Sequence, residues 1–175
     1  MHNFFNIFKI PDLRKRILFI LFVLVIYRIG SYIPISGIDI NQLNNLFNTS
    51  GFLGFVDLFS GGALSRFSIF ALGILPYINA SIIMHLMAIV WPKLKELAEE
   101  GEAGRKKIAQ YTRYLTVIIA FVQGFVMSLS FRSFILPDVS VLWFVSYSIV
   151  GLVAGATFVM WLGELVTIYG IGNGA

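Results

Sequence analysis

One long uncharged stretch of the chain limits its fold more than any other feature. From Ser68 to Trp91 the chain has 24 residues without Asp, Glu, Lys or Arg. As a helix this stretch would be roughly 36 Å long, which exceeds the roughly 30 Å hydrocarbon core of a bilayer. Pro76 removes one backbone hydrogen bond close to Gly73, so we expect a bend there. The stretch predicts a membrane-spanning helix over residues 68–91.

The composition is typical of a polytopic membrane protein. Hydrophobic residues make up 58% of the 175, and the mean hydropathy is +0.84. The chain has no Cys, which excludes disulfides, thiolate nucleophiles and Cys metal sites. Its net charge of +4 comes from cations that flank apolar runs. That placement sets membrane topology, so we expect no nucleic-acid substrate.

The pattern of apolar runs and charges predicts an all-α membrane protein, a bundle of four transmembrane helices with one additional half helix. In chain order we expect a cytosolic amphipathic N-terminus (1–16), a first span (17–34), an outer loop (35–50), the half helix (51–67), a second span (68–91), a basic cytosolic loop (92–111), a third span (112–131), an outer loop (132–139), a fourth span (140–162) and a cytosolic tail (163–175). The cations gather in the N-terminus and the 92–111 loop, which predicts that both ends are cytosolic. Arg28 interrupts the first span, and we expect it to face protein or headgroups.

The half helix is amphipathic and too short to cross a bilayer. Its apolar face is built from side chains at i, i+3, i+4 and i+7, namely Phe52, Phe55, Val56 and Phe59. Gly61 and Gly62 follow and weaken the helix. Such a segment lies in the headgroup region or folds back into a cavity lined by protein, and the periodicity alone favours the headgroup region.

The long apolar stretch carries a stripe about 60° wide at 100° per residue, made up of Ile74, Ile78, Ser81 and His85. Two interpretations remain open on the residues alone. The polar pair could hydrogen-bond to a neighbouring helix, which is the common use of such residues in membrane bundles. The stripe could instead face a narrow path filled with water.

Three motifs resemble the SecY family, the central channel subunits of the bacterial protein translocase. They are SGGALSRFSIFALGILPYINASII (60–83), RIGSYIPISGID (28–39) and EEGEAGRKKIAQYTRY (99–114). The resemblance implies that the half helix is a plug and that Ile74 and Ile78 belong to a hydrophobic pore ring. It also implies that the second and third spans form one side of a lateral gate. Ser81, His85 and Gln123 are its candidate polar residues, with His85 standing where the family has Gln.

The same resemblance implies part of a channel that moves preproteins across and into the bacterial plasma membrane, with no cofactor. The implied partners are SecE-type and SecG-type subunits, a SecA-type motor, the ribosome, preprotein signal sequences and membrane lipids. Arg105, Lys106 and Lys107 in the basic loop could contact the motor or the ribosome, or could anchor the loop to anionic lipid. The chain ends at Ala175, where the family continues into a fifth helix. The alternative is therefore a truncated or remnant four-helix scaffold without transport activity of its own.

Catalytic and metal chemistry find no support in the sequence. The only His within the expected spans is His85, and we expect it about 25 Å from the start of its helix, out of reach of Ser60. The acids are too scattered for a metal site or a carboxylate pair. Glu164 lies where we expect it to reach water at the inner boundary. Gly151 and Gly155 form a small-residue pattern that allows close helix packing.

Overall fold

The computed structural model describes residues 11–172 and 174, and only the backbone of Phe59. Within these residues the regular structure is helical, as expected. It consists of α1 (Pro11–Ser31), α2 (Ile40–Thr49), α3 (Gly51–Ser60), α4 (Leu75–Val90), α5 (Pro92–Glu99), α6 (Glu102–Ser130), the short 3-10 helix η2 (Arg132–Phe134) and α7 (Val141–Tyr169). Most of the amphipathic segment expected over 1–16 lies outside the described residues.

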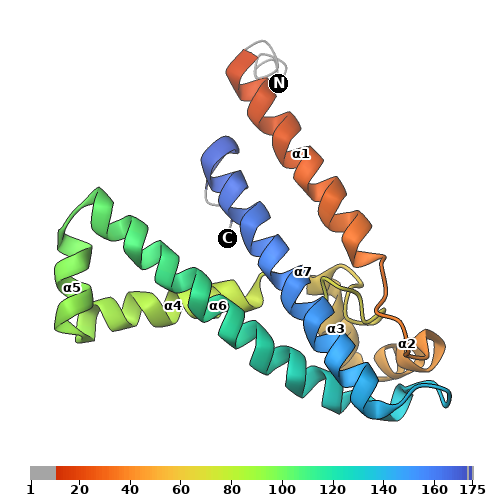
Figure 1. Ribbon diagram of the computed structural model, residues 1–175. Helices are drawn as coiled ribbons and strands as arrows, with labels where there is room; N and C mark the ends of the chain where they lie inside the picture. The colour runs from red at the N-terminus through yellow and green to blue at the C-terminus, as the bar shows by residue number, and fades with distance from the viewer. Residues whose placement is uncertain (1–10, 173, 175) are drawn as a thin grey trace.

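Helices α1 and α7 run antiparallel to each other (Figure 1). The start of α1 contacts the end of α7, and these are the two ends that we predict to be cytosolic. Arg16 Nη1 donates a hydrogen bond of 2.8 Å to the carbonyl oxygen of Gly170. The rings of Phe19 and Tyr169 meet edge to face with centroids 5.8 Å apart. The start of α1 and the end of α7 therefore lie on the same side of the molecule.

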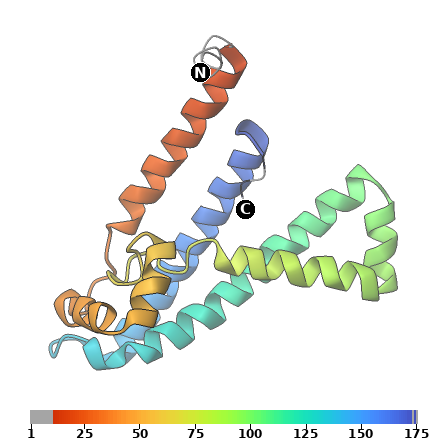
Figure 2. The ribbon, with the colours of Figure 1, turned by 180° about the vertical axis from the view of Figure 1, so that it is seen from behind.

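Helices α4, α5 and α6 form a triangle to one side of the α1–α7 pair (Figure 2). Helix α6 packs against both α4 and α7. Every fourth residue on its buried face is small, in the series Thr112, Thr116, Ala120, Gly124 and Ser128. The buried hydroxyls bond back to the carbonyl four residues earlier, so they need no partner from another helix. This stripe lets α6 approach two neighbours closely.

Length and composition identify two of the described helices, α6 and α7, as able to cross a membrane. The pair α4 and α5 passes the same test only together, and it bends by 99° at Trp91. Helix α1 is not among these candidates, since its basic first turns and Arg28 interrupt the apolar run. Because α6 and α7 are long and apolar enough to cross a membrane, the chain is a helical membrane protein. The full set of four spans stays a prediction.

The helix that we expected over 68–91 begins seven residues later, at Leu75. Pro76 occupies its first turn, where a missing N–H costs no hydrogen bond, so the proline starts the helix instead of bending it. Gly73 has a φ of +55°, which is incompatible with a continuing α-helix. The half helix likewise ends at Ser60, before residue 67, because Gly61 and Gly62 take φ values of +65° and +82°.

The irregular segment 61–74 lies at the centre of the molecule. Ala63, Phe67 and Ser68 have no exposed surface. Phe67 stacks on Phe144 of α7 with centroids 5.7 Å apart. Two backbone hydrogen bonds pair the segment with the chain after α1, from Ile35 N to Phe67 O (3.0 Å) and from Ile69 N to Ile33 O (3.1 Å). Irregular backbone at membrane depth needs partners of this kind from protein.

Three expected loops contain more helix than the sequence pattern indicated. The outer loop 35–50 contains α2, because Asp39 caps the amides of Asn41 and Gln42 and because Leu43 and Phe47 bury one face. The basic loop 92–111 consists of α5 and the first turns of α6. The tail is helical as far as Tyr169, since nothing breaks α7 at residue 162.

Candidate functional site

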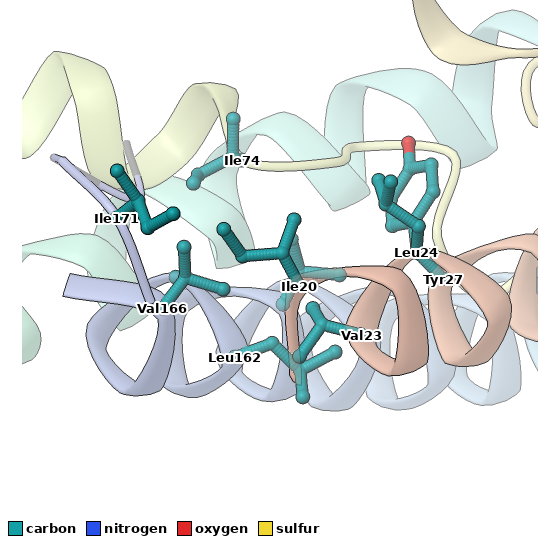
Figure 3. Close-up of a pocket in the computed structure, with 11 residues that line it drawn as sticks. Ile20, Val23, Leu24, Tyr27, Ile74, Leu162, Val166 and Ile171 are labelled. Carbon is teal, nitrogen blue, oxygen red and sulfur yellow. The ribbon is translucent and has the colours of Figure 1, made fainter. Parts of the chain in front are cut away.

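A groove lies between α1, α7 and the start of α4. It brings Ile74, one of the two predicted pore-ring residues, next to side chains of α1 and α7. Its volume is about 410 Å³. The lining is apolar apart from one phenol and comprises Ile20, Val23, Leu24, Tyr27, Ile74, Val159, Leu162, Gly163, Val166, Ile171 and Gly174. Figure 3 shows Ile74 projecting from the chain before α4 toward the side chains of α1 and α7. The groove is thus a water-repelling wall built from three elements.

Gly163 makes the room that Ile74 occupies. A Cβ at position 163 would lie 3.2 Å from Ile74 Cδ1 and equally close to the carbonyl oxygen of Gly174. The returning tail is held by a hydrogen bond of 3.0 Å from Gly174 N to Thr167 Oγ1. Ile78 is half-buried and one turn further on, with its amide bonded to the Ile74 carbonyl (3.1 Å). The predicted one-turn relation of Ile74 and Ile78 is present, although Ile74 precedes the helix.

The predicted apolar face of α3 is turned only in part toward the rest of the described chain. Phe52 is 78% exposed and Phe55 is 59% exposed, while Leu53 packs against the buried core. Val56 lines a second groove with residues of the 61–74 segment, α4 and α6. The side chain of Phe59 lies outside the described residues. The described aromatic residues of the predicted plug therefore keep most of their surface exposed.

Asp57 organises the turn that ends α3. Its Oδ1 accepts hydrogen bonds from Ser60 Oγ (2.8 Å), Leu64 N (3.1 Å) and Ser65 N (3.0 Å). A carboxylate that accepts several donors fixes a turn more firmly than the backbone alone. From the sequence alone we count Asp57 only among the scattered acids. A signal for its role was present, since Asp shortly before two glycines is common in turns.

Arg28 and Tyr27 of α1 reach the same turn. Arg28 Nη1 donates a hydrogen bond of 2.6 Å to Gly61 O, and Nη2 donates one of 3.0 Å to Tyr32 Oη. Tyr27 Oη donates a longer bond of 3.4 Å to Ser60 O. Of the two surroundings that we expected for Arg28, protein or headgroups, the structure shows contacts with protein, although the residue stays exposed. The signal for its importance was available, since a cation inside an apolar run needs a partner.

The three predicted gate residues do not form one cluster. His85 Nδ1 lies 2.7 Å from the Ser81 carbonyl oxygen and 3.3 Å from Ser81 Oγ, both within α4. Gln123 lies elsewhere, in the groove of about 450 Å³ that it shares with Val56 and Asn79. The structure thus adds Asn79 as a polar neighbour of Gln123, and the gate role of all these residues stays a prediction.

The cations of the basic loop are exposed on the first turns of α6. Lys106 pairs with Glu102 (3.5 Å) and Lys107 approaches Glu100 (3.9 Å), while Arg105 lies exposed between Gly104 and Lys106. Surface pairs of this kind contribute little stability. The three side chains are accessible to lipid or to a partner.

Glu164 is more enclosed than we expected. Its side chain is 19% exposed, and Oε1 accepts a hydrogen bond of 2.7 Å from Arg113 Nε. The pair joins α6, about three turns after its start, to the last turns of α7. The side chain keeps part of its surface exposed, so access to water stays a prediction. The Arg113 partner was not predicted, because it is 51 residues away in sequence and leaves no local pattern.

Comparison with known proteins places this arrangement in a family. The SecY family model matches residues 68–175. Among curated relatives named protein translocase subunit SecY, the one from Thermotoga maritima is 46% identical over 98% of this chain, and the one from Halalkalibacterium halodurans is 47% identical over 97%. The Buchnera aphidicola relative is 48% identical over 95%.

These matches cover only part of each relative. The chain spans 42%, 40% and 39% of the three proteins, or about two fifths of their length. The relatives are named for a translocase subunit, a channel family and not an enzyme family. With identity well above 40% along almost its whole length, the chain belongs to the SecY family.

Proposed function

We propose that the chain forms the amino-terminal part of a protein-conducting channel in the bacterial plasma membrane, with both of its ends in the cytosol. Membership of the SecY family supports this proposal. The basic segments that precede α1 and α6 support the orientation, since cations favour the cytosolic side. The close approach of Arg16 to Gly170 supports a common side for both ends.

The apolar groove around Ile74 is the observation that carries the channel role. An apolar neck loses water easily, so it blocks ions while remaining able to widen around a polypeptide. Ile74 is the last residue of the irregular segment before α4, and Gly163 leaves the space that its side chain occupies. In this proposal Ile74 and Ile78 contribute one part of a ring that other segments of the whole channel complete.

Helix α3 acts as the plug in this proposal. It has ten residues, so it is about half as long as a span, and it is connected on both sides by short or irregular chain. Its Phe52 side chain is 78% exposed and would be available to the remainder of the channel. Ser81, His85, Asn79 and Gln123 on α4 and α6 would supply polar groups to a lateral gate for signal sequences.

The expected partners follow from the family and from charge. The whole channel would bind SecE-type and SecG-type subunits, and the exposed Arg105, Lys106 and Lys107 would meet a SecA-type motor, the ribosome or anionic lipid. Replacing all three cations by Gln tests this role. It should weaken motor-driven or ribosome-linked transport, whereas weaker lipid binding alone would assign them to the membrane surface.

The test of the channel role is the resting ion leak of the intact channel in liposomes. Ile74→Gly and Ile78→Gly should each raise the leak several-fold, because each removes apolar surface from the constriction. Ile89→Gly is the matched control, since Ile89 is 74% exposed near the other end of α4. A leak unchanged by both test variants would remove these residues from the constriction.

The 175 residues by themselves should neither translocate a preprotein nor conduct ions. The groove is open on one side, and a ring needs residues that converge from several more helices. Reconstitution of the polypeptide alone into liposomes tests this expectation. Transport by the polypeptide alone would contradict this expectation. If the intact protein transports nothing either, the result would favour the remnant scaffold.

A further inference from the structure

The C-terminal end of α3 carries negative charge that its own sequence does not balance. Helix α3 has no basic residue in its last turn, and Asp57 lies in that turn. The unpaired carbonyls at a helix C-terminus concentrate partial negative charge and attract cations. The end of α3 therefore favours cations from outside the helix. Arg66 of the following segment lies nearby, with its guanidinium carbon 4.0 Å from the Tyr32 ring centroid, but its Nη1 has no hydrogen-bond partner among the described residues. The cation that is hydrogen-bonded to this end comes from another part of the chain.

Arg28 of α1 supplies that cation from 33 residues away in sequence. Its Nη1 lies 2.6 Å from Gly61 O, the residue that caps α3, and such charge-assisted bonds are the stronger ones. Nη2 is bonded to Tyr32 Oη, and the guanidinium carbon lies 4.8 Å from the Tyr32 ring centroid. Tyr32 thereby holds the Arg28 side chain in the orientation that reaches Gly61.

The neighbouring residue of α1 connects the same contact to the groove around Ile74. Tyr27 bonds to Ser60 O at the end of α3 and also lines that groove. Its ring stacks on Phe70 with centroids 5.7 Å apart. One turn of α1 therefore touches the end of α3 and the segment that leads to Ile74.

We propose that Arg28 is a positioning residue that latches the C-terminal end of α3 to α1 and so keeps the channel closed at rest. The latch consists of the Arg28–Gly61 bond, held in place by Tyr32. This inference rests on the proposed plug role of α3. Opening breaks the Arg28–Gly61 bond and the longer Tyr27–Ser60 bond, both to backbone carbonyls, and no covalent or protonation step is required.

The first readout is the mobility of a nitroxide label at position 58 of the intact channel. Leu58 is 77% exposed one turn before Gly61, so a label there disturbs little packing. The chain has no Cys, which makes a single Leu58→Cys label specific in this part of the protein. Arg28→Gln should free the label, and Arg28→Lys should restore most of the restriction because it keeps the charge.

The second readout is the resting ion leak of the same variants. Arg28→Gln should raise the leak about tenfold, as expected for loss of one charged hydrogen bond from the closed state. Tyr27→Phe should change it less than about threefold, because the bond of 3.4 Å is at the limit of hydrogen bonding. Arg132→Gln is the matched control, an arginine in η2 that undergoes the same change of charge away from α3.

Deletion of residues 52–60 separates the latch from the plug role. The latch is supported if the deletion raises the leak and Arg28→Gln raises both the leak and the label mobility. A deletion that raises the leak while Arg28→Gln does not would overturn the latch and leave the plug role intact. A label unaffected by Arg28→Gln would overturn it in any case. If label mobility rises but neither change alters the leak, the contact stands and the plug role fails.

Discussion

Gly155 on α7 should be far less tolerant of a side chain than Gly151 one turn earlier. A Cβ at position 155 would overlap the carbonyl oxygen of Ile69 and lie 2.7 Å from its carbonyl carbon. At position 151 the nearest atoms are two side-chain carbons of Ile35, at 3.4 and 3.6 Å. The small-residue pattern that we predicted for packing two helices thus serves one backbone contact with the 61–74 segment and one side-chain contact with Ile35.

The size of the effect follows from what must move. The methyl group added by Gly155→Ala would push Ile69 away from α7, and overpacking of this kind costs about 1–3 kcal/mol. The displacement also strains the Ile69 N to Ile33 O bond, whose net contribution is about 1 kcal/mol. Since Ala gains about 1 kcal/mol of helix propensity over Gly, Gly155→Ala should lower the free energy of unfolding by about 1–3 kcal/mol. Gly151→Ala should change it by less than about 1 kcal/mol, since Ala also favours the helix.

Denaturant unfolding of the intact protein in detergent micelles measures both variants under the same conditions. The pair shares one helix, one chemical change and adjacent turns, so differences in helix propensity cancel. Equal losses of stability for the two variants would refute the argument, because it depends entirely on the proximity of the Ile69 carbonyl to position 155.

Three other predictions concern single contacts. Arg113→Gln and Glu164→Gln should each lower the free energy of unfolding by about 1–3 kcal/mol, because each leaves the other member of a partly buried pair without its partner. The double variant should lose less than the sum of the two, and additive losses in the unfolding assay would contradict the pairing. Asp57→Asn should speed hydrogen exchange of the amides that donate to Asp57 about tenfold, and unchanged exchange would mean that the carboxylate does not hold the turn. Gln123→Leu and His85→Leu should each alter which signal sequences an export assay accepts, and unchanged selectivity would remove both from the gate.

Helix existence could be predicted wherever a long apolar run controls the outcome. Residues 112–131 and 140–162 were predicted as spans, and they correspond to the 29-residue helices α6 and α7. Both helices extend beyond the predicted spans, α6 from Glu102 and α7 to Tyr169, because nothing in the apolar run marks where α6 begins or α7 ends. For α2, the cap at Asp39 and the spacing of Leu43 and Phe47 were present in the sequence but were outweighed by its polar composition.

The candidate site was less accessible to such inference. Ile74 was identified through the family motif, but its place opposite Gly163 depends on the tail that folds back along α7. Ser81 and His85 share one face, as helical spacing predicts, whereas the separation of Gln123 from them depends on how α6 packs against α4.

The sequence by itself determined that the chain is a helical membrane protein of the SecY family, because hydrophobic length, charge placement and motif identity are all local properties. Only the tertiary structure decided that residues 61–74 leave the helix and form the centre of the molecule. The burial of Phe67 and its backbone bonds to the 33–35 segment outweigh the helical preference of a long apolar run. Tertiary packing likewise decided that Arg28 meets Gly61, since no periodic pattern relates residues on separate elements whose contact depends on how those elements pack.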